Sequence, residues 1–182
     1  MTQREKDLAL VDEFVQNPGL KRHMLAVEAA VGAYAKKYAQ DEALWASVGL
    51  LHDFDYERWP DPPSHPLEGS KILRERGYPE ELIYAILSHA DYLSDQYPRR
   101  SLLDKTLYAC DELCGFITAC ALLRPQRLEG LTASSVRKKM KTLNFAAAVN
   151  RDDINRGAAE LGVDLNEHID FCVAAMAEAH IV

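Results

Sequence analysis

The stretch GLLHDFDYE, residues 49–57, places a histidine and an aspartate, His52 and Asp53, at the end of an apolar helical run. Adjacent residues on an α-helix point about 100° apart, so this doublet can still converge on one cation from the end of the helix. An aspartate at the edge of a helical core is costly to desolvate unless it is paired, hydrogen-bonded or bound to a cation. The doublet therefore indicates a metal site.

Four further residues with metal-binding side chains lie on both sides of this doublet: His23, His65, His89 and Asp111. Each occupies an inward-facing position or an end of an expected helix, and Asp111 interrupts an otherwise apolar helical face. Any one of these histidines alone is more often a hydrogen-bonded core or surface residue, and Asp111 has an alternative interpretation as the acid partner of a buried Arg or Lys. Imidazole and carboxylate together suit Fe, Mn, Zn or Co. The joint pattern favours one metal site assembled from five helices.

The remaining histidines and the four cysteines indicate no second site. His168 and His180 lack the same context, and we expect both at the surface. The cysteines show no CxxC spacing, and Cys110 and Cys114 lie one helical turn apart, where disulfide geometry is poor. We therefore expect reduced and mostly buried thiols.

Helical periodicity dominates the chain, and strand signals are nearly absent. Prolines, glycines and capping residues divide the pattern into expected helices over residues 4–16, 20–38, 41–53, 65–77, 79–92, 101–123, 133–143, 151–161 and from 165 onward. In the fourth of these, His65 is expected near the N-cap and Pro66 at the first helical position. The prediction is an all-α, single-domain bundle of about eight or nine helices over residues 1–182. Its ligand-bearing core covers about 20–123, and the C-terminal helices of 132–182 pack on it.

The composition limits the classes of function. At 182 residues and 48% hydrophobic, the chain is long enough for one core that buries roughly 70% of the unfolded surface. The formal net charge of -7 argues against binding duplex DNA or an anionic membrane through a broad basic face. Met1 to Asp7 is charged, and no run approaches about 18 apolar residues. We expect a soluble, cytoplasmic protein whose anionic substrates, if any, are small.

Two further segments are expected near the site. Three prolines make residues 54–64 an irregular loop, which we place at the rim of the pocket. Lys105, shortly before Asp111, is the cation most expected to reach the pocket. The basic run at 137–141 and the pair Arg99 and Arg100 are most simply solvated, with phosphate binding as the alternative.

The residues above resemble the HD superfamily of metal-dependent phosphohydrolases, which is named after its His-Asp doublet. The likeness covers about residues 23–115 and consists of five blocks in order: KRHMLAVE, GLLHDFDYE, HPLEGSKIL, YPEELIYAILSHADY and SLLDKTLYACDEL. The doublet alone is a weak signal, whereas five ordered blocks are a strong one. The resemblance implies an all-α bundle, in agreement with the expected helices.

The resemblance also implies a set of metal ligands. Superfamily members with one metal ion bind it at the positions of His23, His52, Asp53 and Asp111. Members with two ions add two histidines, which correspond to His65 and His89, and Asp53 then bridges the ions. We expect the dinuclear form with two divalent cations, drawn from Fe, Mn, Zn, Co and Mg.

For activity, the resemblance implies a phosphohydrolase in which a water activated by two cations attacks a phosphoryl group. The candidate catalytic residues are Asp53, Asp55 and Lys105, and Asp55 or Asp91 is expected to orient water or protonate a leaving group. The blocks look closest to HDIG-type proteins, which include bacterial hydrolases of diadenosine tetraphosphate. The cyclic-di-GMP phosphodiesterase branch fits less well, because Ala-Asp-Tyr follows His89 where that branch has a second histidine and a Gly-Tyr-Pro signature. We expect a small phosphorylated substrate, a nucleotide or dinucleoside polyphosphate, with no DNA or membrane partner, and the oligomeric state stays open.

Two other functions use the same residues. HD-fold oxygenases hold a mixed-valent di-iron pair in this ligand set and activate dioxygen. A non-catalytic signalling module would keep the fold and the metal, and its discriminating feature would be a lost ligand. The hydrolase is favoured because the HPLEGS and SLLDK blocks look more like the hydrolase branch and no ligand is missing.

Overall fold

The chain folds into helices only. A computed structural model describes residues 1–182 and contains nine α-helices, one short 3-10 helix and no strand. Their bounds are α1 Gln3–Phe14, α2 Pro18–Lys37, α3 Glu42–Leu51, α4 Ser64–Glu75, α5 Glu80–His89, η1 Asp91–Leu93, α6 Leu102–Leu122, α7 Ala133–Met140, α8 Arg151–Leu161 and α9 Leu165–Glu178. The predicted all-α class is confirmed, and every expected helix is present with ends shifted by a few residues.

Local capping explains where several of these helices begin. Asn17 accepts hydrogen bonds from the first backbone amides of α2, and Asp41 accepts one from the amide of Leu44 in α3. Ser101 and Asp104 form a reciprocal capping box at the start of α6. Each cap satisfies amide groups that have no partner inside the helix. The helices that carry His23 and Asp111, and the helix that leads to the His52-Asp53 doublet, therefore have well-defined starting points.

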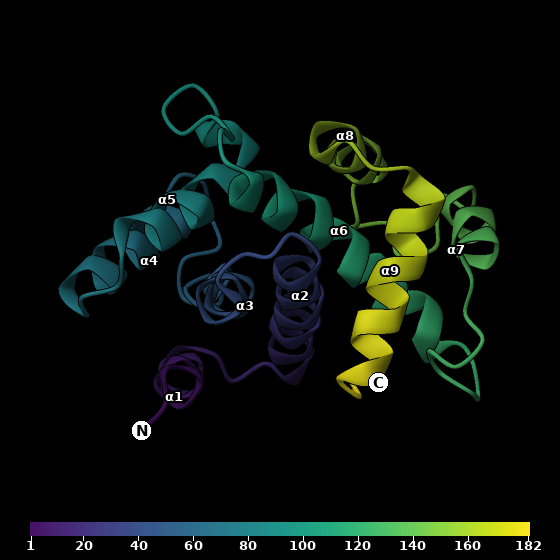
Figure 1. Cartoon of the computed structure of the whole chain (residues 1–182), viewed down its shortest axis with the longest axis horizontal. Coiled ribbons are helices and arrows are strands. Elements are labelled where there is room, and N and C mark those ends of the chain that lie inside the picture. The colour runs from purple at the N-terminus through teal and green to yellow at the C-terminus, as the bar shows by residue number, and fades with distance from the viewer.

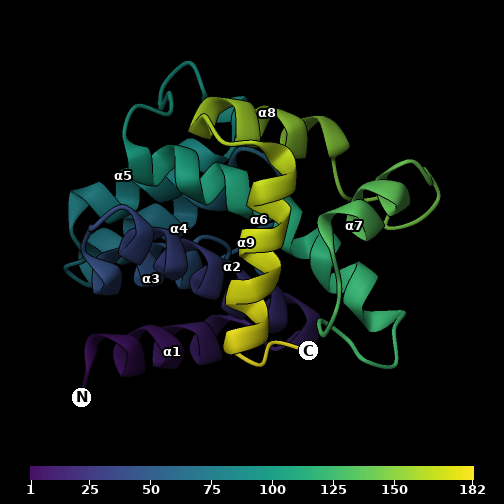
Figure 2. The ribbon, with the colours of Figure 1, turned by 45° about the vertical axis from the view of Figure 1, so that its right-hand side comes forward.

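The helices form a bundle around α2, α3 and α6. Figure 1 shows α2 beside α3 near the centre and α6 passing above them, with α4 and α5 beyond α3 and α7 to α9 on the opposite side. Figure 2 shows α9 lying across α2 and α6. The pairing of α2 with α3 depends on Gly49, because a Cβ there would lie 2.8 Å from the carbonyl oxygen of Val27. Close packing of these two helices brings His23 near the end of α3.

One continuous hydrophobic core holds the bundle together. It contains 44 buried residues and draws on all nine α-helices, so no separate core exists for the C-terminal helices. All four cysteines are free and buried in it, as predicted. No helix is both long and apolar enough to cross a bilayer.

The start of α4 differs from the prediction. The helix begins at Ser64 after Pro63, and His65 and Pro66 depart from helical geometry, with His65 at φ -79° and ψ 135°. The cause is local, because a residue before proline is pushed out of the helical region toward extended backbone. Pro66 is therefore not a simple first helical residue, and His65 lies in a kink rather than at an N-cap.

The prediction that His168 lies at the surface is wrong. His168 is fully buried in α9, where its Nδ1 accepts a hydrogen bond from the hydroxyl of Tyr34 at 2.7 Å. Its Nε2 donates to the carbonyl oxygen of Ala109 at 2.9 Å. His168 lies four residues before Cys172, on the same inward face of the helix. His180 is exposed, as expected.

Candidate metal centre

The structure brings the six predicted ligands to one place from five helical segments. His23 comes from α2, His52 and Asp53 follow the last residue of α3, His65 lies at the start of α4, His89 ends α5 and Asp111 lies in the middle of α6. They form two groups whose candidate ligand atoms lie within 4.8 Å of one another. Group A is His23, His52 and Asp111, and group B is Asp53, His65 and His89.

Group A joins α2, α3 and α6. The Nε2 atom of His23 lies 3.0 Å from Oδ1 of Asp111 and 3.2 Å from Nε2 of His52. His52 Nε2 lies 3.4 Å from the same Asp111 oxygen. Two imidazole nitrogens and a carboxylate oxygen therefore face a common point.

Group B has the same construction, and Asp53 connects it to group A. Nε2 of His65 lies 3.3 Å from Nε2 of His89 and 3.2 Å from Oδ1 of Asp53. The other carboxylate oxygen of Asp53, Oδ2, lies 3.4 Å from Nε2 of His52 and 3.7 Å from Nε2 of His23. Asp53 thus presents one oxygen to each group.

The hydrogen bonds behind the rings show that these side chains suit a cation. The Nδ1 atoms of His52 and His89 face the carbonyl oxygens of Gly49 and Ile86, and Nδ1 of His65 faces the carboxylate of Asp55 at 2.7 Å. These oxygens only accept hydrogen bonds, so each Nδ1 carries a proton, and in the neutral form that binds a metal each ring turns its Nε2 lone pair inward. In that neutral form, Nε2 of His65 and Nε2 of His89 point two lone pairs at each other across 3.3 Å. A divalent cation between them resolves this contact, and imidazole with carboxylate is a donor set that Fe, Mn, Zn and Co accept.

The shifted pKa values of the candidate ligands indicate a negative electrostatic potential at this centre. Burial lowers the pKa of His52, but Asp53 and Asp111 outweigh it and raise the value to about 9. Burial likewise lowers the pKa of His65, but Asp53 and Asp55 outweigh burial and raise this pKa to about 10. Although burial opposes the shift, His52 holds the pKa values of Asp53 and Asp111 well below their usual range. The centre therefore favours positive charge strongly.

Asp55 does not occupy the position that the sequence suggested. It is almost fully buried, its Oδ1 accepts from His65, and its Oδ2 accepts from the backbone amide of Gly69 at 2.8 Å. Both oxygens are engaged by these groups and Asp55 does not line the cavity, so its predicted role in orienting water or protonating a leaving group finds no support in this geometry and stays a prediction. Its role in the structure is to hold the ring of His65.

A cavity of about 610 Å³ opens beside the two groups. Tyr56, Pro60 and Pro62 line one side of it, which confirms that the loop over residues 54–64 forms part of the rim. Tyr92 lines the same cavity, and its hydroxyl donates a hydrogen bond to the backbone carbonyl of His65. Burial, followed by Asp55 and Asp53, raises the pKa of Tyr92 to about 12. A volume of this size suits a small molecule.

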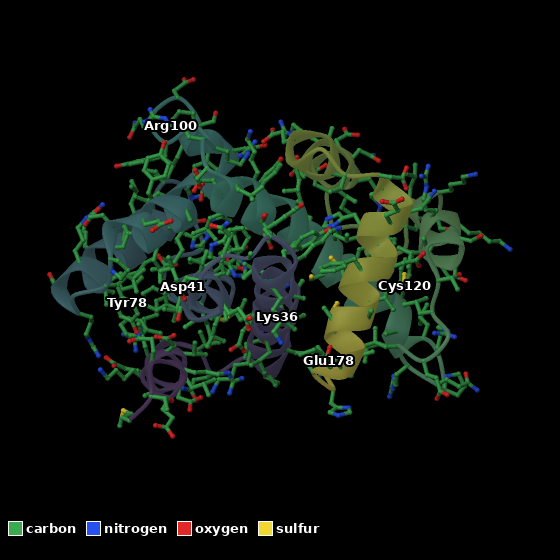
Figure 3. The ribbon with its side chains drawn as sticks, in the orientation of Figure 1. Lys36, Asp41, Tyr78, Arg100, Cys120 and Glu178 are labelled. Atoms are coloured by element: carbon green, nitrogen blue, oxygen red, sulfur yellow. The ribbon has the colours of Figure 1, made fainter.

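The structure does not bring the predicted cations to this cavity. Lys105 is half-buried in α6 and does not line it. Arg100 is exposed on the loop before α6 (Figure 3). Its guanidinium lies 5.6 Å from the centroid of the Tyr84 ring. The basic residues at 137–141 belong to α7 and the turn after it, and none of them lines the cavity. For Lys105 the reason is helix geometry, because this residue lies on a different face of α6 from Asp111.

The sequence interpretation missed several residues of the cavity wall. Glu112, Val149 and Asp153 line it, and the last two lie after α7 and at the start of α8. Burial, and after it the neighbouring Asp111, raises the pKa of Glu112 to about 7. The sequence gives no signal for Glu112, because periodicity shows which residues lie inward but not which partly exposed residues border a hollow. Nothing in the sequence pattern places Asp153 near the histidines.

Comparison with known proteins agrees with this geometry. The family model described as HD domain matches residues 20–115, slightly more than half of the chain, and the match includes all six candidate ligands. A segment of 98 residues is 34% identical to Ribonuclease Y of Desulfotalea psychrophila, and it covers 52% of this chain but only 18% of that ribonuclease. No solved structure matches. By its matched segment and its His-Asp centre, the chain belongs to the HD domain family.

Proposed function

We propose that the protein is a metal-dependent phosphohydrolase that cleaves a phosphate ester or anhydride in a small, nucleotide-like substrate. The observation that supports this most is the placement of Asp53, which presents one carboxylate oxygen to each group of candidate ligands. Group A with Asp53 would hold one divalent cation, and group B would hold the second. Fe, Mn, Zn, Co and Mg are the candidates, since the donor set alone does not choose among them.

When bound, divalent cations lower the pKa of a coordinated water toward neutrality and offset the charge that builds on phosphoryl oxygens. The protein contributes orientation. The hydrogen bonds that Nδ1 of His52, His65 and His89 donates hold the rings in one orientation with Nε2 inward. Fixed ligands of this kind need no rearrangement during the reaction, which is how a preorganised site lowers a barrier.

The cavity wall supports a nucleotide-like substrate. Tyr56 is exposed at the rim, with its ring edge-on to His65 at 5.2 Å between centroids, and Tyr92 is half exposed beside it. Exposed aromatic rings offer flat surfaces on which a base can stack. Dinucleoside polyphosphates, which the sequence resemblance also suggests, belong in the same screen.

The name of the relative, Ribonuclease Y, raises RNA as a substrate. We propose a small molecule instead, because no Lys or Arg lines the cavity and the chain carries a net charge of -7. Proteins that bind RNA strands use basic surfaces to contact successive phosphates. A short RNA oligonucleotide in the screen tests this directly.

The decisive experiment combines metal analysis with an anaerobic activity screen. The protein is purified without oxygen, its metals are counted, and the Mn-loaded and Fe-loaded forms are given mononucleotides, dinucleoside polyphosphates, sugar phosphates and RNA. Release of phosphate or nucleotide by the wild type, absent in His52→Ala and Asp53→Ala, supports the proposal. Oxygen uptake with an EPR signal from a half-reduced iron pair, and no anaerobic hydrolysis, would overturn it in favour of the oxygenase.

A further inference from the structure

The charges around the candidate metal centre are unusual for a pocket that accepts phosphates. The residues lining the cavity include no Lys or Arg. They include five carboxylates: Asp53, Asp91, Asp111, Glu112 and Asp153. Pockets that hold several phosphate groups supply Lys or Arg to most of them. Among the lining residues, positive charge for a phosphoryl group can come only from the metal centre itself.

Two guanidinium groups contact carboxylates of this cavity wall and are held by them. Arg99, whose side chain is 8% exposed, lies with Nη1 2.9 Å from Oδ1 of Asp91 and with Nε 2.7 Å from Oε2 of Glu160. Arg156 is paired with both Asp91 and Asp153. This network fixes the wall formed by η1 and α8, and both cations in it already have anionic partners.

Glu112 is the lining carboxylate that belongs neither to the two ligand groups nor to this arginine network. Its Oε2 accepts a hydrogen bond from the backbone amide of Asn150 at 3.1 Å, which fixes the side chain between α6 and the N-terminus of α8. No Lys or Arg forms an ion pair with Glu112. A substrate group that lies beyond the metal centre would therefore face the carboxylate of Glu112. An anionic group would be repelled by it, and a cationic group would form an ion pair with it.

From this distribution of charge, and resting on the phosphohydrolase activity proposed above, we propose that the pocket selects substrates with a single phosphoryl group. The organic part of such a substrate is uncharged or positively charged, and polyphosphates are rejected. The metal centre receives the one phosphoryl group. Glu112 determines the specificity, because it repels a second anionic group and pairs with a substrate ammonium or hydroxyl group.

Part of this specificity lies outside the segment that matches the HD domain family. Glu112 is inside the match, which ends at residue 115, but Asn150, Asp153 and Arg156 lie beyond it. The C-terminal helices therefore complete the substrate wall. Selection by charge is a property of this chain rather than of its His-Asp centre.

A charge-matched panel tests the proposal. At pH 8, the Mn-loaded protein is given phosphoethanolamine, ethyl phosphate and phosphoglycolate, which differ in the charge of the organic part, and AMP, ADP and diadenosine tetraphosphate, which differ in phosphate number. Values of kcat/KM are measured for turnover, and dissociation constants for the same compounds are measured by calorimetry with the Ca-loaded protein. We expect affinity and turnover to fall from cationic to anionic compounds and from AMP to the polyphosphates, by about tenfold for each added charge.

Two variants locate the effect. Glu112→Gln keeps the acceptor for Asn150 and removes the charge, so the preference for cationic over anionic compounds should shrink about tenfold. Glu178→Gln removes a charge from the exposed far end of α9 and should leave the preference unchanged (Figure 3). Circular dichroism melting checks that both variants fold. If Glu112→Gln does not fold, the panel measured with the wild type still tests the proposal.

The outcomes separate this inference from the proposed function. Turnover of ADP or diadenosine tetraphosphate as efficient as that of AMP would overturn the inference and leave the hydrolase standing. Equal affinity for the cationic and anionic compounds would also overturn it. Charge-selective binding without any turnover would overturn the hydrolase and support the inference.

Discussion

Nδ1 of His65 donates a hydrogen bond to Oδ1 of Asp55 across 2.7 Å, and the same carboxylate accepts a second bond from the amide of Gly69. Asp55 thereby fixes the tautomer and the direction of the ring, so that Nε2 of His65 faces Asp53 and His89. A carboxylate that orients a metal-binding histidine in this way typically changes metal affinity by 10–100-fold when it is lost. Group B therefore depends on a residue that does not line the cavity.

The first prediction concerns Asp55→Asn. An amide can satisfy only one of the two donors, His65 or Gly69, so the His65 ring loses its fixed direction. We expect affinity for the second metal equivalent to fall roughly 10–100-fold while the first equivalent is retained. Calorimetric titration of the metal-free variant with Mn measures both steps, and wild-type affinity for both would contradict the role of Asp55.

The second prediction concerns Gly69. A Cβ at this position would lie 2.7 Å from both Cγ and Oδ2 of Asp55, so Gly69→Ala forces the carboxylate away from His65. Overpacking of this kind costs about 1–3 kcal/mol of unfolding free energy. We expect that loss together with weaker binding of the second metal ion, measured by urea unfolding and by metal titration.

Gly32→Ala is the matched control for Gly69→Ala. Its Cβ would meet only the Cβ of Ala46, at an ordinary 3.7 Å, and Gly32 lies inside α2. Alanine in a helix interior is favoured over glycine by about 0.5–1 kcal/mol. We expect Gly32→Ala to bind both metal ions normally. If Gly69→Ala also binds both ions normally, the prediction is wrong and metal binding tolerates displacement of Asp55.

The third prediction concerns acid stability and His168. Burial lowers the pKa of His168 below its ordinary value of 6.5, and Lys37 adds to the shift, although the carbonyl of Ala109 opposes it. As the pH falls below 6.5, His168 therefore becomes protonated in the unfolded chain before it becomes protonated in the native protein. The stability contributed by neutral His168 is present above that pH and is lost as the pH falls further.

His168→Asn tests this point. The variant loses at least one of the bonds to Tyr34 and Ala109, so we expect it to be about 1–3 kcal/mol less stable than the wild type at pH 7.5. The difference in unfolding free energy between the two proteins should shrink at pH 5.5, because only the wild type has a buried histidine whose protonation favours the unfolded state. Urea unfolding with saturating Mn at both pH values measures this. A difference independent of pH would mean that His168 is not held neutral.

The six candidate ligands were predictable because each occupies either an inward-facing position or an end of its own expected helix. Asp111 interrupts an apolar face, and His89 follows Leu82 and Ile86 on one face. Helix ends were predictable for a similar reason, since caps such as Ser101 act on the nearest amides. These signals are local, so one sequence carries them.

The remaining features depend on contacts between distant segments. Asp55 turns away from the cavity because the chain after α3 packs against the amide of Gly69 in α4, which lies 14 residues further along. Burial of His168 requires α9 to lie against α2 and the backbone of α6. The wall formed by Glu112 and Asp153 exists only once α8 packs on α6. Periodicity within one helix contains no information about such pairings.

The central claim is that two groups of ligands, joined by Asp53, bind two metal ions. Metal stoichiometry after saturation with Mn and removal of free ions tests it most directly, in the wild type and in His65→Ala. We predict two ions per wild-type chain and one ion in His65→Ala, because that variant keeps His23, His52, Asp53 and Asp111. Two ions retained by His65→Ala, or only one bound by the wild type, would contradict the account.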